Sequence, residues 1–502
     1  KKIKADLGFN PLNPEMVKTA GFDTGKPSCL AIMNIQVNAD NTEKSNFDLL
    51  SLLPVSDGAK ALETIRFSFD NNNVDYENIS KNDLSLIKWA APEANGCLAV
   101  KDEYLYLSVN PQTDPQSFLE SVLKTDSSLP NAKAFSELIS GTDFGRELVF
   151  YVNIANIVDT NLGPLKQIMA EQQSPQRPDA AAVFESVKEY SAGTMTADLN
   201  NPSFIVDTVV SLAPDSDIKR IWEPGRIEQE KVLSINDPAV LLLSFGADFM
   251  QYYKMITEMM PPEEYESLKT RLDSVREKSG IDVKEELIDN LSGSVNLATY
   301  DGASITMLNY NTLFTAGVKD EKVIKEAIDK AIKLLPPDKQ AMISRRKIGN
   351  MDAYVINAGL VQVYAGIDKN KFLLASGKPM FEKALGDQKN SGFAANLVDM
   401  QLKNSLLSNQ NIFYLNLDEL IKIVNNFAMF LIDPAGGEQK FKDKMNAAGR
   451  FEYILSSSKL DGDRITSVFT VKTRFGRPFF AGVADLIEKL KLHDQSPNVQ
   501  QE

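Results

Sequence analysis

The stretch Phe150-Tyr151-Val152-Asn153-Ile154 returns roughly 260 residues later as Phe413-Tyr414-Leu415-Asn416-Leu417. In both places an apolar segment with the spacing of a helix follows directly. A strand that leads straight into a helix is therefore expected twice in the chain. Similarity at a fixed displacement is the sequence signature of a structural unit that has been copied.

Four further pairs of segments keep the same order and about the same displacement. They are residues 98–107 with 364–374, 115–122 with 378–385, 134–139 with 392–398, and 193–212 with 451–473. The first and last pairs each resemble a β-hairpin, and Asp461-Gly462 supplies two residues that readily take the positive φ of a tight turn. Five matches in constant order are hard to obtain by chance, so the sequence predicts a tandem duplication.

The length of the chain agrees with this division. A chain of 502 residues exceeds the size of one ordinary hydrophobic core. The polar, turn-prone segment 215–237 is the expected boundary between the copies. We therefore expect an N-terminal repeat at residues 1–222, a C-terminal repeat at 223–490 and a polar tail at 491–502.

The pattern of strands and helices predicts the fold class. Strand candidates such as residues 30–37 and 312–318 occur in hairpin-linked groups, and helix candidates separate the groups. Residues 320–335, for example, place apolar side chains on one helical face and end at Pro336-Pro337. The expected fold is α+β, with two tandem copies of an antiparallel-sheet unit and helices packed on one face.

The sequence lacks the residue sets of the common catalytic centres. His493, in the polar tail, is the single histidine, which excludes a Ser-His-Asp triad, a Cys-His dyad and a multi-histidine metal site. Glycine-rich phosphate loops and the GxSxG motif do not occur. We therefore expect no enzyme, no cofactor and no metal site. The alternative is an unrecognised hydrolase that uses the Ser85/Lys88 pair or carboxylates such as Glu286.

The two cysteines, Cys29 and Cys97, lie in apolar, strand-like runs. Two buried free thiols would suit such positions. A disulfide between neighbouring strands would also suit them, in an oxidising compartment. Both interpretations stay open at the level of sequence.

An apolar stripe ahead of Pro261 is the candidate binding surface. Its residues are Phe249, Tyr252, Tyr253, Ile256, Met259 and Met260. A stripe of this kind is typical of a helix face packed on a sheet. Because methionine and aromatic side chains also suit an adaptable pocket, these six are the speculative ligand-binding residues for a lipid-like ligand or a partner groove.

Charge and hydropathy limit the partners. The formal net charge is −14 and no basic face is visible, so nucleic acid is not expected as a partner. No apolar run approaches the roughly 20 residues that a membrane-spanning helix needs. The chain starts at Lys1 without a methionine, which fits a mature exported protein that a signal peptide or a lipid-bearing cysteine once preceded. The expected partner is a protein or an apolar ligand.

Several segments resemble a known family. Residues 280–298 begin with Gly280-Ile281-Asp282 at a predicted helix start and continue through a Leu-Ser-Gly turn into a strand. Residues 8–12 (GFNPL) and 21–23 (GFD) add to the likeness. These segments resemble exported bacterial proteins of the domain of unknown function 3352 family. The resemblance implies an extracytoplasmic address and a repeated α+β fold, and it supplies no catalytic residues.

Taken together, these features predict a non-catalytic binding or structural protein of the periplasm or cell surface, with an unidentified ligand. A carrier of a lipid-like ligand is one alternative, and an unrecognised hydrolase is the other.

Overall fold

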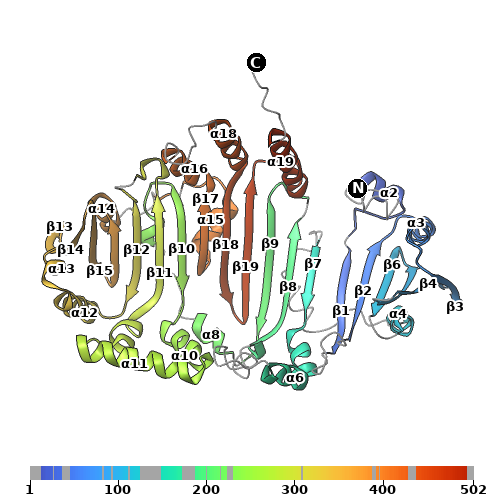
Figure 1. Ribbon diagram of the computed structural model, residues 1–502, viewed down its shortest axis with the longest axis horizontal. Helices are drawn as coiled ribbons and strands as arrows, with labels where there is room; N and C mark the ends of the chain where they lie inside the picture. The colour runs from blue at the N-terminus through green and yellow to red at the C-terminus, as the bar shows by residue number, and fades with distance from the viewer. Residues whose placement is uncertain are drawn as a thin grey trace, which may run out of the picture. The chain divides into compact units, whose positions relative to one another are not determined.

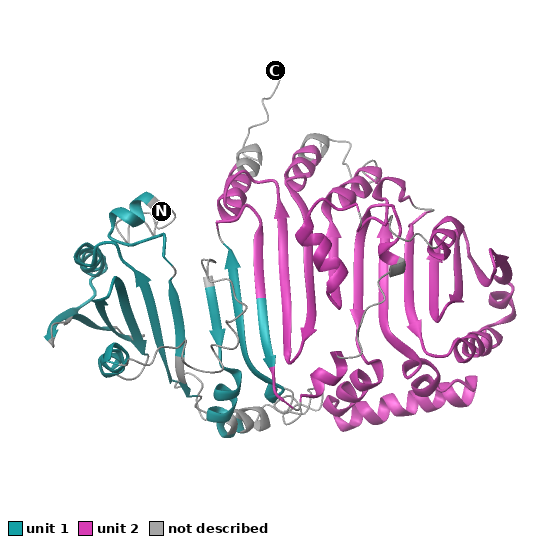
Figure 2. Cartoon of the chain, turned by 180° about the vertical axis from the view of Figure 1, so that it is seen from behind, with its two compact units in different colours: residues 1–174, 183–199, 208–211 teal, residues 175–182, 200–207, 212–502 magenta. Residues whose placement is uncertain are grey.

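A computed structural model gives the fold of the chain (Figure 1). It describes residues 13–26, 28–36, 46–81, 84–91, 94–110, 114–124, 148–171, 187–198, 200–214, 216–222, 230–306, 309–386, 392–394, 396–427 and 437–494. The chain divides into two compact units, coloured separately in Figure 2. Unit 1 holds residues 1–174, 183–199 and 208–211, and unit 2 holds 175–182, 200–207 and 212–502.

Two series of elements follow one another along the chain, which we call the first copy and the second copy. The first copy contains α2 (Pro14–Thr19), β1 (Cys29–Gln36), β2 (Asn46–Pro54), α3 (Gly58–Asn71), β3 (Tyr76–Lys81), β4 (Leu84–Ala91), β5 (Ala94–Lys101), β6 (Tyr104–Asn110), α4 (Pro115–Lys124), β7 (Leu148–Val152), α6 (Ile154–Glu171), β8 (Tyr190–Asp198) and β9 (Phe204–Leu212). The second copy contains η3 (Val283–Ile288), β11 (Leu291–Tyr300), η4 (Gly302–Ser304), β12 (Thr312–Val318), α12 (Glu321–Leu334), α13 (Pro337–Gln340), β13 (Ile343–Ile348), β14 (Met351–Ala358), β15 (Val361–Asp368), β16 (Lys371–Ser376), α14 (Lys378–Leu385), α15 (Met400–Ser408), β17 (Asn411–Asn416), α16 (Leu417–Asn426), α18 (Gly437–Ala448), β18 (Phe451–Asp461) and β19 (Arg464–Thr473). Between them lie α8 (Asp217–Trp222), α9 (Glu230–Leu233), β10 (Ala239–Gly246), α10 (Phe249–Met259) and α11 (Pro262–Ser279), and α19 (Phe479–Asp494) follows the second copy.

The strand order is the same in the two copies. In the first copy, strands pair antiparallel in the order β1-β2-β6-β5-β4-β3. In the second copy, the equivalent strands pair antiparallel in the order β11-β12-β16-β15-β14-β13. In chain order, a helix of 14 residues (α3 or α12) follows the second strand of each copy, and a shorter helix (α4 or α14) follows the sixth. The predicted α+β fold with two copies of an antiparallel unit is therefore confirmed.

The hairpins β5-β6 and β15-β16 contain the same two-residue turn. Asp102 and Glu103 have φ angles of 50° and 65°, and Lys369 and Asn370 have φ angles of 50° and 60°. All four residues lie in the left-handed region that a type I′ turn requires at both central positions. The sequence match between residues 98–107 and 364–374 thus reflects one turn geometry used twice.

Each of these turns is tied to the second strand of its sheet by one backbone hydrogen bond. The amide of Val55 donates to the carbonyl oxygen of Glu103 at 2.9 Å, and the amide of Val318 donates to that of Asn370 at 2.8 Å. Val55 and Val318 are both buried. These two equivalent hydrogen bonds therefore align the sequence of the second copy with that of the first.

Helix caps repeat as well. The side chain of Asn13 accepts amide hydrogen bonds at the start of α2, and that of Asp282 does so at the start of η3. Asp57 caps α3 and Asp320 caps α12 in the same way. A side-chain oxygen at this position satisfies amides that the first helical turn leaves without partners.

The repeated Phe-Tyr motif is a strand-to-helix junction in both copies. β7 leads directly into α6 and β17 into α16. Asn153 accepts a hydrogen bond from the amide of Asn156 at 3.0 Å, and Asn416 accepts one from Glu419 at 3.1 Å. The asparagine in the motif is thus the helix cap. The matched segment 134–139 lies outside the described residues.

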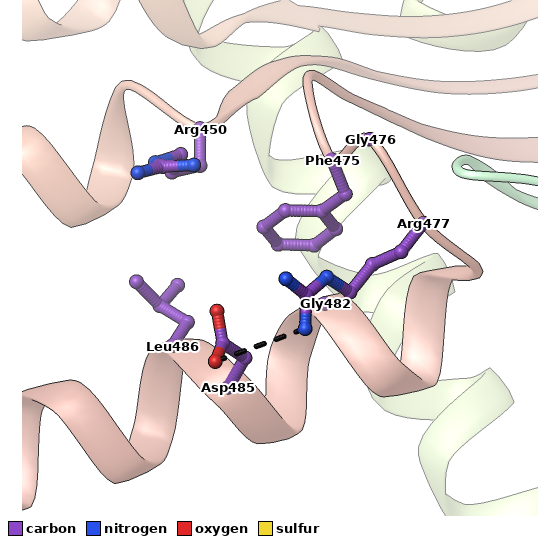
Figure 3. Close-up of a pocket in the computed structure, with 7 residues that line it drawn as sticks. All are labelled: Arg450, Phe475, Gly476, Arg477, Gly482, Asp485 and Leu486. Carbon is purple, nitrogen blue, oxygen red and sulfur yellow. Dashed lines mark ion pairs between the residues drawn. The ribbon is translucent and has the colours of Figure 1, made fainter.

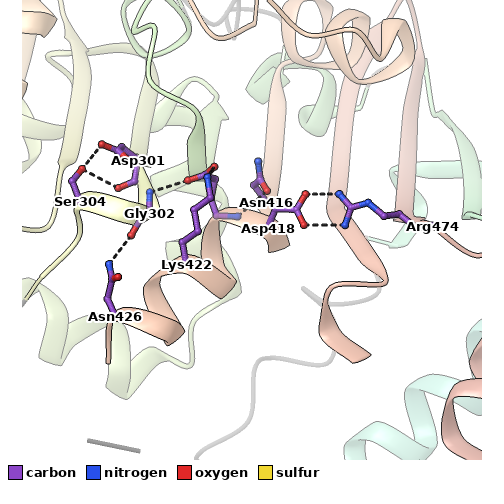
Figure 4. Close-up of polar contacts among 9 residues, drawn as sticks. Asp301, Gly302, Ser304, Asn416, Asp418, Lys422, Asn426 and Arg474 are labelled. Atoms are coloured by element: carbon purple, nitrogen blue, oxygen red, sulfur yellow. Dashed lines mark hydrogen bonds and ion pairs between the residues drawn. The ribbon is translucent and has the colours of Figure 1, made fainter. Parts of the chain in front are cut away.

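An asparagine amide on each of these helices binds the end of a strand. Asn161 of α6 donates to the carbonyl oxygen of Ile35 on β1 at 2.9 Å. Asn426 of α16 donates to that of Gly302, just past β11, at 3.3 Å (Figure 4). The helix is therefore held against the first strand of its copy by the same type of contact.

Helices cover both faces of the sheet β1-β2-β6-β5-β4-β3 in the first copy. The prediction that helices pack on one face only is therefore wrong. Leu119 of α4 packs in one core cluster with Leu86, and Leu62 of α3 packs in another with Ile87. Leu86 and Ile87 are neighbours on β4, and successive strand residues point to opposite faces. The runs of consecutive apolar residues in these strands are typical of a sheet buried on both faces.

The second copy has the same arrangement. Phe381 of α14 shares a core cluster with Leu373 of β16. Ile324 of α12 shares a different cluster with Phe372, the preceding residue on that strand. One helix therefore packs on each face of this sheet too.

Candidate functional site

The first copy contains an apolar cavity between α3 and the sheet, which we call the α3 cavity. Its volume is about 270 Å³. Ten residues line it, namely Phe22, Leu53, Thr64, Ile65, Ser68, Phe69, Trp89, Leu98, Leu105 and Leu107. None of these ten side chains carries a charge, and eight of them are wholly hydrocarbon or aromatic in character.

Trp89 forms one wall of the α3 cavity, and its position depends on Gly96. The two residues lie directly opposite each other in the β4-β5 pair. A Cβ atom on Gly96 would lie 1.8 Å from Cζ2 of Trp89, so the indole occupies space that any other residue would fill. Glycine within a strand often marks such a close approach. The indole therefore lies low over the sheet, and the space toward α3 stays open.

Aromatic rings from α3 and β3 extend this wall. The centroid of the Phe69 ring, on α3, lies 5.1 Å from that of Trp89, and the two planes meet at 53°. The Phe69 ring is also 5.6 Å from Tyr76 on β3, at an angle of 49°. These tilted contacts are favourable for aromatic pairs and fix the wall in place.

The polar groups of the lining side chains are two hydroxyls on α3, those of Thr64 and Ser68, and the indole N–H of Trp89. Oγ1 of Thr64 lies 3.1 Å from the carbonyl oxygen of Ala20 and 2.9 Å from that of Lys60, so its proton is already engaged. The ten lining residues contain no acid–base pair and no set of metal ligands. Such a lining favours a hydrocarbon ligand.

The matched turns identify the equivalent positions in the second copy. Val363 lies as far ahead of the β15-β16 turn as Gly96 lies ahead of the β5-β6 turn. Ile356 lies directly opposite Val363, in the position of Trp89. A pair of β-branched side chains thus replaces the indole and the glycine.

A polar network lies beside α12 in the second copy. The hydroxyl of Tyr354 donates to Oδ1 of Asp329 at 2.9 Å, and the guanidinium of Arg345 pairs with the same carboxylate. The guanidinium lies 5.2 Å from the centroid of the Tyr354 ring. Burial, together with the hydrogen bond to Asp329, raises the pKa of Tyr354 to about 12. The hollow that these residues help to line, about 620 Å³ in volume, is therefore polar, unlike the α3 cavity.

The predicted stripe lies on α10 and directly after it. The rings of Phe249 and Tyr252 contact that of Phe245 on β10, with centroids 5.9 Å and 5.8 Å apart. No side chain of α10 is fully buried. The other stripe residues are half-buried, namely Tyr253, Ile256, Met259 and Met260. None of the six predicted residues lines the α3 cavity, which sequence reasoning did not find.

Phe245 also belongs to a row of exposed rings on one face of the sheet in unit 2. Phe245, Phe413 and Phe469, on β10, β17 and β19, are each 38 % exposed. Ser456 on β18 lies directly opposite both Phe413 and Phe469 and separates them. The row continues the predicted stripe as a second apolar surface.

Cys29 and Cys97 are both free thiols, so the disulfide interpretation is wrong. They lie on β1 and β5, which β2 and β6 separate in the sheet. Neighbouring strands are about 4.8 Å apart, which places the two residues on the order of 14 Å from each other, beyond the reach of a disulfide. Cys29 is exposed, whereas Cys97 is buried, and burial raises the pKa of the Cys97 thiol to about 11.

The hydrolase candidates make contacts of a structural kind. Ser85 and Lys88 lie on strand β4, where an odd spacing directs them to opposite faces rather than to one helical face. Lys88 pairs with Asp114 at 3.1 Å. Glu286 pairs with Lys330 at 3.0 Å. The structure therefore does not bring these residues together as a site.

A smaller hollow lies beside the start of α19 (Figure 3). Its volume is about 150 Å³, and Arg477 and Asp485 form an ion pair within it at 3.8 Å. Because it is smaller than the α3 cavity and its charges are partly paired, the α3 cavity is the better candidate site.

Fold and cavity together define the class: a tandemly duplicated α+β protein with an apolar cavity in its first copy. The chain belongs to the family described as "Protein of unknown function (DUF3352)", whose family model matches residues 25–450. No curated protein and no solved structure matches the chain. Within the described parts of the chain, no helix combines the length and the apolar character needed to span a membrane.

Proposed function

We propose that this protein is a non-catalytic binding protein that holds an apolar ligand in the α3 cavity. The observation that carries the proposal is the lining of that cavity, which is apolar apart from two hydroxyls and the indole N–H of Trp89. The row from Phe245 to Phe469 and the α10 stripe are a second candidate surface, and contacts with a protein partner are their proposed role.

The size of the α3 cavity supports a ligand. An apolar protein cavity of about 150 Å³ stays dry and binds benzene, and the α3 cavity is larger, at about 270 Å³. The α3 cavity is partly open to solvent, so a ligand that enters it removes apolar surface from water, which is favourable by about 25 cal/mol per Å².

A purely structural role is the competing proposal. In a structural protein, larger side chains at the cavity would add stability at no cost to function. At the position of Gly96 the second copy has Val363, a larger side chain, and at the position of Trp89 it has Ile356, a smaller one. The two copies therefore differ at the wall of the α3 cavity, which supports a role for the first copy that the second does not share.

The proposal includes an extracytoplasmic location, in the periplasm or at the cell surface, with a lipid anchor as one means of retention. The location is supported by the likeness to exported proteins. Fractionation of the producing cells tests it. Recovery in the envelope fraction is expected, and recovery in the cytosol alone would contradict the location without bearing on the cavity.

Native mass spectrometry of the full chain, purified without detergent from cells, tests ligand binding. We expect one apolar adduct per chain, which denaturation releases. Ser68→Leu fills part of the α3 cavity and should remove the adduct. Ser121→Leu, the same substitution at an exposed position of α4, is the matched control and should retain it. A bare chain in every preparation, and no lipid in an organic extract, would rule out the proposal.

A further inference from the structure

We infer that β1 and β7 bind an extended β-strand of a partner polypeptide between them, at the place that β10 occupies in the second copy. We call the place between β1 and β7 the seam. It is separate from the α3 cavity, because no residue of β1 or β7 lines that cavity.

Beyond the six matched strands, the two copies differ in strand order. In the second copy, β10 lies between β11 and β17 and pairs antiparallel with both. In the first copy, β1 and β7 are the equivalents of β11 and β17, and each stands at the end of a sheet. Among the described residues, no ladder hydrogen bond joins β1 to β7. A strand that the second copy contains is thus missing from the seam.

Side chains of β1 are open to solvent where their equivalents in the second copy are covered. The strand register places Leu30 at the position of Leu297, and Ala31 at that of Ala298. Leu30 is 50 % exposed, whereas Leu297 is half-buried. Ala31 is half-buried, whereas Ala298 is fully buried. Successive strand residues point to opposite faces, so β1 lacks cover on both faces, as expected where a neighbouring strand is absent.

The same difference is present on β7. Val149 and Tyr151 are half-buried, whereas their equivalents Ile412 and Tyr414 are buried. Tyr414 lies directly opposite Leu242 of β10, which is fully buried. Both edges of the seam therefore lack the cover that β10 gives to the second copy.

The seam is narrower than the equivalent space in the second copy. β1 and β7 lie side by side in unit 1 (Figure 1). Ile35, the acceptor of the Asn161 hydrogen bond, stands at the position of Gly302, the acceptor of the Asn426 hydrogen bond. Asn161 is the eighth residue of its helix and Asn426 is the tenth. Two helical residues span about 3 Å, which agrees with β7 lying nearer to β1 than β17 lies to β11.

A strand can enter if the seam opens. Two strands that flank a third are separated by about 10 Å, which is twice the usual spacing. Since no ladder hydrogen bond joins β1 to β7 in the described part of the chain, opening breaks no ladder. The entering strand would then satisfy backbone groups on both edges, which is the source of affinity in β-strand addition.

The pairs that β10 makes define the chemistry of the strand that fits. Leu243 lies directly opposite one residue of β11 and one of β17, and the equivalents of those two are Leu30 and Phe150. Phe150 is 40 % exposed, so an apolar residue between it and Leu30 would cover both side chains. The strand therefore runs antiparallel to both neighbours and has apolar residues at three successive positions, as β10 does at residues 241–243.

The strand comes from a partner polypeptide rather than from a second copy of this chain. β10 is held by ladders on both of its edges, and Leu242 at its centre is fully buried. A second molecule could donate β10 only by opening its own sheet.

Fluorescence anisotropy of a labelled peptide tests the inference. The peptide carries residues 237–248 (DPAVLLLSFGAD), which include β10. The full chain should bind one peptide with saturation. The same peptide with Leu242→Pro should bind at least about tenfold more weakly, because proline cannot donate a hydrogen bond to a ladder. Equal binding of the two peptides, or no binding of the first, would overturn the inference and leave the proposed function of the α3 cavity intact.

Leu30→Lys and Phe150→Lys test the two edges of the seam. Each places a charge beside the entering strand and removes apolar contact, so each should weaken peptide binding at least about tenfold. Leu407→Lys is the matched control, because Leu407 on α15 is 56 % exposed and lies outside the seam, and it should bind as the wild type does. Circular dichroism confirms that each variant is folded. Undiminished binding by either edge variant would overturn a site between β1 and β7.

A charge swap tests the register. The peptide with Leu243→Glu should bind Leu30→Lys up to about fivefold more tightly than the unsubstituted peptide does, because the new charges lie directly opposite each other. Leu241→Glu lies two positions along the strand and should restore less. Equal restoration by the two peptides would contradict the β10 register.

The oligomeric state of the peptide-free chain tests the source of the strand. Size-exclusion chromatography with light scattering should give a monomer. A dimer that Leu30→Lys dissociates would show that a second copy occupies the seam, and would overturn the assignment to a partner polypeptide.

Discussion

Glu419 and Gly302 fit together without space for another atom. Oε2 of Glu419 accepts a hydrogen bond from the amide of Gly302 at 3.0 Å, and a Cβ atom on Gly302 would lie 2.1 Å from the backbone oxygen of Glu419. The carboxylate is buried, and Lys422 neutralises its charge (Figure 4). This contact joins α16 to the end of β11 within the second copy.

Gly302→Ala should therefore destabilise the protein by about 3 kcal/mol, because backbone on both sides must move to admit the methyl group. Urea unfolding of the two proteins measures the difference. Gly476→Ala is the control, since nothing lies within 4 Å of a Cβ at that exposed position, and its effect should be near zero. Equal effects of the two substitutions would show that the Glu419 contact is looser than described.

Ser68→Leu should raise the free energy of unfolding by about 1 kcal/mol, because the added side chain fills part of the α3 cavity. Ser121→Leu makes the same change at an exposed helical position, so it should bring only the small gain in helix propensity. Denaturant unfolding of the ligand-free proteins compares them. A loss of stability in Ser68→Leu would mean that this side chain cannot enter the cavity.

The two thiols should react at very different rates. Residue Cys29 is exposed, although partial burial of its thiol raises its pKa, whereas Cys97 is buried and has a pKa of about 11, so very little Cys97 thiolate forms. With a chromogenic disulfide reagent at pH 8, we expect one fast thiol in the native chain and a second only after unfolding. Cys29→Ser should abolish the fast phase and Cys97→Ser should leave it. Two fast thiols in the native chain would disagree with the position of Cys97 in the core.

Stability should depend on pH through Asp399. Partial burial on its own would raise the pKa of this carboxyl group, but hydrogen bonds from the amide of Leu402 and the hydroxyl of Tyr453 outweigh it, and the pKa is lowered. The amides of Gln401 and Leu402 each lie 3.0 Å from Oδ1, and the Tyr453 hydroxyl lies 2.8 Å from Oδ2. The native state thus holds the proton less tightly than the unfolded state does.

The resulting stability is fully present above the ordinary carboxyl pKa of about 4, and it is lost as pH falls through the lower native pKa. Asp399→Asn removes the titrating charge. The difference in stability between the wild type and this variant should therefore shrink from pH 6 to pH 2. Urea unfolding across this range measures it, and a constant difference would argue against a lowered pKa.

The duplication could be recognised from the sequence because its strongest match covers a segment in which several residues are each required by the local structure. A strand, a capping asparagine and a helix follow one another within a few residues at Asn153 and again at Asn416. Local chemistry of that kind is visible in a sequence. The order of the strands in the sheet is not visible in a sequence. The apolar segments around Cys29 and Cys97 therefore could not show that two strands separate these cysteines.

The α3 cavity was missed for a related reason. It depends on the register that sets Trp89 opposite Gly96, and on α3 packing over that pair. The one signal in the sequence is a tryptophan separated from a glycine by a short hairpin, which is a weak pattern. The consecutive pairs Leu86-Ile87 and Leu98-Ala99 did carry the information that both faces of the sheet are covered. The expectation of helices on one face did not use that information.

Trp89 itself offers the most direct test of ligand binding. The chain has two tryptophans, so in Trp222→Phe all tryptophan emission comes from Trp89. Titration of this variant with decanoate should produce a saturable change in emission, with one site per chain. Trp89→Phe, which retains Trp222, should give no change at the same concentrations. Emission from Trp89 that stays constant up to saturating decanoate would contradict a ligand in the α3 cavity.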